Sequence, residues 1–90
     1  NFYIMSRYTE TEIETLRKVS SGQWLVVVRK TNYTRKGLFT ISSEIFYSYY
    51  TNDSMAVDDF RSDDKKRYLD GKKRLIWQAK AYGDKEIIKY

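Results

Sequence analysis

The apolar positions of the chain are concentrated in one run, Trp24-Leu25-Val26-Val27-Val28, the only five consecutive apolar residues in the sequence. Valine is stiff at χ1 and suits a pleated strand better than a helix. Because the run has no polar alternation, it needs cover on both faces, and residues 24–30 are therefore predicted to form a central strand. A charged residue at Val27 is expected to prevent folding, since a carboxylate there cannot be solvated.

The N-terminal part of the chain predicts a strand followed by a helix. Aromatic and β-branched residues at 2–8 favour the strand. Residues 9–21 carry helix signals, because Thr9 and Glu12 fit a capping box and acidic residues precede basic ones along the segment. Gly22 is well placed to end this helix.

The middle of the chain predicts a hairpin and then a polar segment. Residues 24–30 and 38–42 have β-type composition and are joined by the polar stretch 31–37, which is rich in turn formers. The aromatic residues at 45–50 favour a strand over a helix. The polar stretch 51–73 is predicted to be a short or broken helix, with a partly mobile loop as the alternative.

The C-terminal part returns to alternation of apolar and polar residues over 74–82, which predicts a strand paired with 86–90 through a turn at Gly83-Asp84. The expected fold is α+β: a small antiparallel sheet with two helices against one face. The leading topology is ferredoxin-like, βαββαβ, with an added C-terminal strand. Residues 1–90 are expected to form a single domain, since the chain is too short for two cores.

The composition removes most catalytic chemistry from consideration. The chain has no Cys and no His, which excludes disulfides, zinc-thiolate sites, thiol nucleophiles and the commonest general base. Asp58-Asp59 and Asp63-Asp64 are interpreted as a solvated helix surface, not as a metal site. No catalytic residue, metal or cofactor is therefore predicted, and the remaining enzyme class is a ribonuclease that cleaves with Lys, Arg and Tyr alone.

Charge and aromatic content suggest a binding surface. The net charge is +5, from 17 basic and 12 acidic residues, and nine tyrosines are present. Basic side chains can pair with phosphates while tyrosine rings stack on bases, and exposed aromatic residues also serve as protein-binding hot spots. The candidate binding residues are Arg29, Lys30, Tyr33, Arg35, Lys36, Phe46, Tyr50, Lys72, Lys73 and Arg74.

Two functions remain open from the sequence, and the expected partner is nucleic acid or an acidic protein surface. The first is a small nucleic-acid-binding domain that uses its basic loops and tyrosines. The second is a protein-interaction module, such as a phage- or mobile-element-encoded inhibitor of a host protein that handles nucleic acid or serves in defence. The apolar runs are far shorter than the ~20 residues of a membrane helix, and no signal segment is evident. We therefore expect a cytoplasmic protein that does not enter a membrane.

Overall fold

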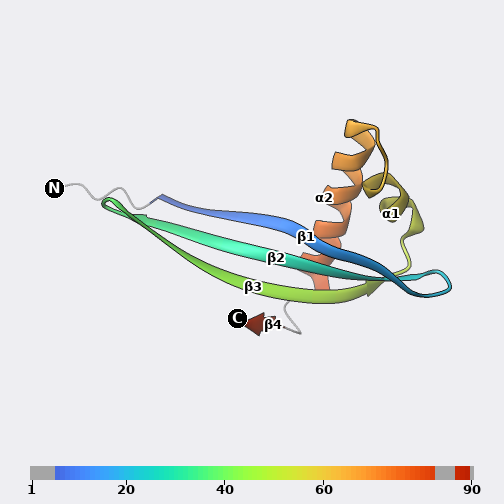
Figure 1. The fold of residues 1–90 in the computed structure, drawn as a ribbon, viewed down its shortest axis with the longest axis horizontal. Helices are drawn as coiled ribbons and strands as arrows, with labels where there is room; N and C mark the ends of the chain where they lie inside the picture. Colours follow the sequence, from blue (N-terminus) through green and yellow to red (C-terminus); the bar gives the residue numbers. More distant parts are fainter. Residues whose placement is uncertain (1–5, 83–86, 90) are drawn as a thin grey trace.

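A computed structural model describes residues 6–82 and 87–89 of the chain. Its elements are, in order, β1 (Ser6–Ser20), β2 (Gln23–Lys36), β3 (Phe39–Thr51), α1 (Ser54–Phe60), α2 (Lys65–Tyr82) and β4 (Ile87–Lys89). The strands form one antiparallel sheet in the order β1-β2-β3-β4 (Figure 1). The predicted α+β class is confirmed.

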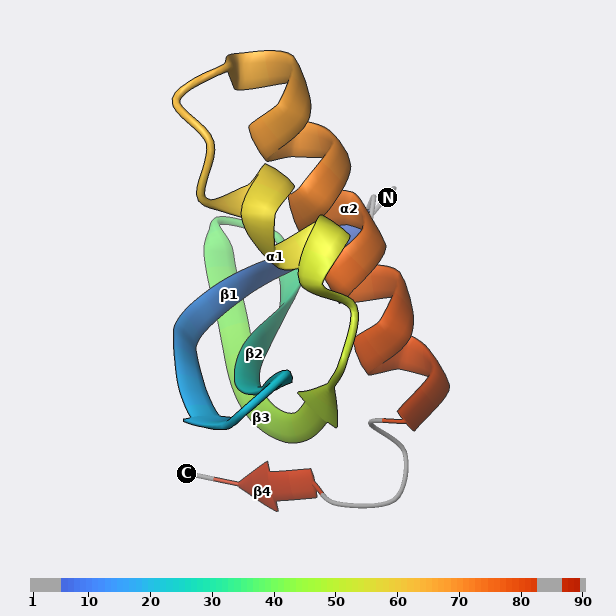
Figure 2. The same cartoon turned by 90° about the vertical axis from the view of Figure 1, so that its right-hand side faces the viewer.

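The three long strands extend well beyond the two helices. Both helices stand on one face of the sheet near one end, and the rest of the sheet projects away from them (Figures 1 and 2). The described part of the chain is accordingly elongated, with extents of 57 × 29 × 17 Å. We call the projecting part the arm; it comprises residues 6–11 of β1, 30–36 of β2 and 39–45 of β3.

The hydrophobic core lies between the helices and the sheet. We call the face of the sheet on which the helices pack the front face, and the other the back face. Core residues of the front face pack against both helices: Val26, Val28, Tyr47 and Tyr49 lie beneath Ala56, Val57, Leu75 and Ala79. Because strand side chains alternate between faces, the arm continues this front face without helical cover.

The central position of residues 24–30 is confirmed, since β2 lies between β1 and β3. The expectation that both faces of the run are fully covered is wrong. Val26 and Val28 are fully buried, whereas Leu25 and Val27 are only partly buried on the back face. There they are shielded by neighbouring strands, where Leu25 is paired with Tyr50.

The two helices make unusually close contact at Gly71. A Cβ atom at this position would lie 2.3 Å from the backbone nitrogen of Phe60 and 2.6 Å from the carbonyl oxygen of Ala56. Asp53 caps α1 by accepting a hydrogen bond from the Ala56 backbone N–H at 3.1 Å. The predicted broken helix in 51–73 is thus confirmed, and Gly71 lies inside α2.

The helix predicted over 9–21 is wrong, because this segment belongs to β1. Capping and dipole effects contribute only about 1 kcal/mol each, whereas pairing with β2 supplies a backbone partner along the strand. Residues 6–8 of the strand predicted over 2–8 also lie in β1; the remainder falls outside the described residues.

The predicted connection at 31–37 and its Arg35-Lys36 loop are also wrong. Residues up to Lys36 belong to β2, and Lys36 pairs directly with Phe39, so Gly37 and Leu38 alone form the turn. Residues 24–30 therefore pair with 45–51 and not with 38–42. The strand predicted for 45–50 is confirmed as part of β3.

The strand predicted over 74–82 is wrong, since these residues complete α2. The buried positions Gly71, Leu75 and Ala79 recur every four residues, which is a helical period that the local alternation concealed. Residues 87–89 do form a strand, but it pairs with β3, not with 74–82. The order βββααβ replaces the ferredoxin-like βαββαβ; the predicted turn at Gly83-Asp84 lies outside the described residues.

Candidate functional site

The front face of the arm carries basic and neutral side chains and no acidic one among the described residues. Register and alternation place eleven residues on it: Arg7, Thr9 and Thr11 of β1, Lys30, Asn32, Thr34 and Lys36 of β2, and Phe39, Ile41, Ser43 and Ile45 of β3. Thr9 Oγ and Asn32 Oδ1, 3.0 Å apart, are hydrogen-bonded across two strands, in agreement with this placement. Two predicted binding residues, Lys30 and Lys36, therefore share this surface.

Two acidic residues of the strands, Glu14 and Glu44, neutralise Arg29 on the back face, whereas Glu12 of β1 reaches Lys72 of α2. The Arg29 Nε atom lies 2.7 Å from Glu14 Oε1, and its Nη1 atom lies 3.5 Å from Glu44 Oε1. The Nε contact has the geometry of an ion pair and not of a hydrogen bond. Arg29 was predicted as a phosphate contact, but the structure commits its charge to two carboxylates.

Tyr33 also lies on the back face, where it is engaged by its neighbours. Its ring stacks on Tyr8 with centroids 4.6 Å apart, and its hydroxyl donates a hydrogen bond to Glu10 Oε2 at 3.5 Å. Partial desolvation, and then the Glu10 carboxylate, raise the pKa of Tyr33. One side of the ring is therefore occupied, which does not favour the predicted stacking on a base.

The other predicted back-face residues do not gather with the basic front face. Arg35 is exposed at the end of the arm and makes no ion pair within the described residues. Phe46 is partly buried opposite Arg29, and Tyr50 is exposed opposite Leu25. These side chains are on the opposite side of the sheet from Lys30 and Lys36.

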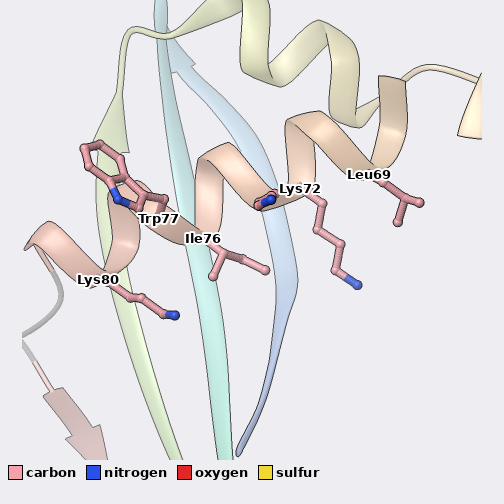
Figure 3. Close-up of a pocket in the computed structure, with 6 residues that line it drawn as sticks. Leu69, Lys72, Ile76, Trp77 and Lys80 are labelled. Carbon is pink, nitrogen blue, oxygen red and sulfur yellow. The ribbon is translucent and has the colours of Figure 1, made fainter. Parts of the chain in front are cut away.

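Helix α2 adds a second basic surface next to the arm. It carries one acidic residue, Asp70, and seven basic residues: Lys65, Lys66, Arg67, Lys72, Lys73, Arg74 and Lys80. A shallow groove along it is lined by Leu69, Lys72, Lys73, Ile76, Trp77 and Lys80 (Figure 3). Ile76 and Lys80 extend from the side of α2 opposite α1, which is the side of the arm in Figure 1.

Ion pairs divide the predicted cluster Lys72-Lys73-Arg74. Lys72 Nζ lies 2.8 Å from Glu12 Oε2, and Arg74 Nε lies 2.9 Å from Asp53 Oδ2. Within the described residues Lys73 has no such partner. The helix therefore presents Lys73 as an available cation, whereas its two neighbours help to fasten α2 to β1 and to the start of α1.

Sequence reasoning missed Trp77 and Lys80, because residues 74–82 were interpreted as a strand. Trp77 is 69 % exposed. Spacings of three and four residues place Leu69, Lys73 and Ile76 on the same side of the helix as these two. A helical-period count over 65–82 is the signal that would have identified this side.

Metal and membrane chemistry find no support in the part of the chain that the structure describes. No group of three or more acidic, His or Cys side chains is close enough there to hold a metal ion. None of the described helices combines the length and apolar character required to cross a bilayer.

The arrangement thus brings together two adjacent basic surfaces, with Glu12 paired to Lys72 where β1 meets α2, and leaves the arm carboxylates Glu10 and Glu44 on the back face. Such a surface can pair with several phosphates. Comparisons of the chain with protein-family models, with curated proteins and with solved structures found no significant match.

Proposed function

We propose that the protein binds double-stranded nucleic acid, without catalysis, through the front face of the arm and the adjoining side of α2. The observation that carries this proposal is the acid-free front face. Within the arm, the described carboxylates Glu10 and Glu44 both lie on the back face, and Glu12, just beyond the arm, is neutralised by Lys72 of α2. A polyanion repels carboxylates at close range, so their confinement to the back favours a partner at the front.

The chemistry of the front face suits a phosphate backbone. Lys30 and Lys36 lie three two-residue repeats apart on the central strand, with Asn32 and Thr34 between them on the same face. At about 3.3 Å per residue, the two lysines are roughly 20 Å apart along β2. Lysine ammonium groups pair with phosphates, and hydroxyl and amide groups contribute further hydrogen bonds to the backbone.

The positions of the tyrosines favour a duplex over a single strand. Binding of single strands relies on aromatic rings that are open to stacking with bases. Tyr33 stacks on Tyr8, Tyr47 and Tyr49 are buried, and Tyr68 stacks on Phe60 with centroids 5.3 Å apart. The exposed rings of the proposed surface are Phe39 at the turn and Trp77 on α2, so the described front face in the middle of the arm, between Lys30 and Lys36, offers no ring for stacking.

The experiment compares two double variants that remove the same number of charges from neighbouring positions. Lys30→Gln with Lys36→Gln alters the front face, and Arg29→Gln with Arg35→Gln alters the back face. Binding to a duplex of about 30 base pairs is measured across a salt series; this duplex exceeds the ~17 pairs that the 57 Å length spans at about 3.4 Å per pair. DNA and RNA duplexes are both used.

We expect the front-face variant to bind more weakly and to lower the log–log salt slope by about 2, since each lost phosphate contact removes about 0.9. The back-face variant should keep the slope of the unmodified protein. Equal slopes for both variants would refute the front face as the interface. Gel analysis of the same RNA samples tests for cleavage, which the proposal does not predict.

A second candidate function is supported by the apolar residues on α2. Leu69, Ile76 and Trp77 line one groove among lysines, and Trp is enriched at protein-binding hot spots. An acidic protein surface would complement it, which keeps the inhibitor hypothesis as the alternative proposal. If this is the function, Trp77→Ala abolishes capture of a protein partner, and duplex binding by the unmodified protein disappears at physiological salt.

A further inference from the structure

The end of the arm exposes three apolar side chains far from the core. Leu38 is 98 % exposed, Phe39 is 75 % exposed and Ile41 is 60 % exposed. We call Leu38 and Phe39 the tip. They are located at the turn between β2 and β3, at the opposite end of the long strands from the turn that enters α1 (Figure 1).

The turn that presents the tip is tight and well defined. Lys36 pairs with Phe39, which leaves Gly37 and Leu38 as a two-residue turn. Gly37 has φ +61°, and no described residue other than glycine has positive φ, so only the first turn position is left-handed. This is the pattern of a type II′ turn, which matches the twist of the strands and holds Leu38 outward.

Folding gives no reason for these side chains to be apolar. The tip is not part of the hydrophobic core. Residues in tight turns are ordinarily polar. Cations adjoin it: Lys36 is next to Gly37, and Arg35 is paired with Thr40 on the other face. Phe39 and Ile41 belong to the acid-free front face, which is the surface assigned above to a duplex.

We propose that Leu38 and Phe39 insert between two base pairs of the bound duplex and bend it. This inference rests on the proposed function and adds its mechanism. Apolar Phe, Leu, Ile or Met side chains that enter a base step unstack it and kink the duplex, while flanking basic groups hold the phosphates on either side. Lys36, which precedes Gly37 on the front face, is placed to be one of those groups, whereas Arg35 points to the back face.

An alternative occupant, an apolar site on a protein, is disfavoured by the surroundings of the tip. The described arm residues nearest to it, from Thr34 to Ile41, include two cations and no carboxylate. Two apolar side chains with cations nearby match a duplex, which has stacked bases beside phosphates, better than they match a purely apolar cleft on a protein.

The test uses the full chain and a DNA duplex of about 30 base pairs with a donor and an acceptor fluorophore at its ends. The variant is Leu38→Ser with Phe39→Ser, which leaves every charge in place. Both side chains are exposed, so the fold is expected to persist, and circular dichroism checks it. Met55→Ser is the matched control, because Met55 is 68 % exposed and lies on α1, away from the arm.

The unmodified protein and Met55→Ser should shorten the end-to-end distance on binding, in proportion to occupancy. The tip variant should still bind at low salt with an unchanged salt slope, but it should leave the duplex straight. Its affinity should fall about tenfold or more, and a duplex carrying a mismatch should bind the unmodified protein more tightly, since unstacking there is easier.

Three results would overturn the inference in distinguishable ways. Binding by the unmodified protein without bending shows that the duplex surface exists but the tip does not insert. Bending that persists in the tip variant assigns it to another element. Failure of the unmodified protein to bind any duplex removes the proposed function, and the tip inference with it.

Discussion

The hydroxyl of Tyr49 donates a hydrogen bond to the backbone carbonyl of Leu75, 2.5 Å away, and so joins the third strand to the long helix. Both residues are buried in the core. Burial, and then the Asp53 carboxylate, raise the pKa of Tyr49, because the ionised phenolate is poorly solvated there. The contact makes the attachment of α2 to the sheet sensitive to alkaline pH.

Stability is expected to fall as the pH rises above about 10, the ordinary pKa of tyrosine. In that range the unfolded chain loses the Tyr49 proton while the folded chain keeps it, so the unfolded state binds fewer protons and is favoured. Tyr49→Phe should cost about 1 kcal/mol at pH 7 and should reduce this alkaline loss. Urea unfolding of both proteins at pH 7 and at about pH 11 measures this difference in stability.

Tyr33, whose pKa is also raised, is present in both proteins and cancels in the comparison. Equal pH dependence in the two proteins would contradict the role of Tyr49.

Gly71→Ala is predicted to destabilise the protein by about 1–3 kcal/mol, because the new methyl group meets the backbone of α1. The sign of the change in unfolding free energy distinguishes a close contact from open space, because at an open helical position Gly→Ala stabilises the protein by about 1 kcal/mol. Thermal or urea unfolding measures it. Ala81→Gly, at an exposed position of the same helix, serves as the reference for helix propensity. A more stable Gly71→Ala protein would mean that α1 and α2 are not in contact there.

Val28→Asp is predicted to leave the protein unfolded at 25 °C, since Val28 is fully buried and a lone carboxylate has no partner there. Val27→Asp should be tolerated better, because Val27 is only partly buried on the back face. Circular dichroism and heteronuclear NMR spectra of the two variants test this contrast. The burial of the two residues thus moves the expected critical position from Val27, where the sequence placed it, to Val28. Identical behaviour of the two variants would argue against the assignment of faces.

On α2, Lys73→Gln with Lys80→Gln should lower the salt slope of duplex binding by about 2. Arg67→Gln with Arg74→Gln is the matched pair, because both arginines are committed to carboxylates, at 3.0 Å from Asp59 and 2.9 Å from Asp53. That pair should affect thermal stability more than the slope. If the arginine pair changed the slope and the lysine pair did not, α2 would contact the duplex by its other side.

Some elements of the fold could be predicted from the sequence, because the local conformational preference of their residues is the same as the structure they adopt in the folded protein. The valine run predicted a central strand, and β-branched and aromatic composition predicted β3. The helix signals in 9–21 misled, because alternating Thr and Glu residues fit a capped helix and a half-exposed strand equally well. Long-range pairing with β2 decided between them.

The candidate site was harder to predict from the sequence, since it depends on the register in which the strands pair. Neighbours in the sequence, such as Arg29 and Lys30, point to opposite faces, and only the pairing of the strands shows which of them meets carboxylates. The sequence indicated a basic protein with the right kinds of residue. It could not show that Arg29, Lys72 and Arg74 are neutralised while Lys30, Lys36 and Lys73 are available.

The separation of carboxylates from the front face has a consequence for the way the molecule meets a polyanion. Within the arm, Lys30 and Lys36 lie on the front face and Glu10 and Glu44 on the back face, so the electrostatic potential differs between the two faces. If the partner is a nucleic acid, as proposed, its phosphates exert a torque that turns the front face toward them before contact, so that many encounters begin with this face toward the duplex. Added salt shortens the reach of this torque to about 8 Å at physiological ionic strength and leaves collisions to chance beyond it.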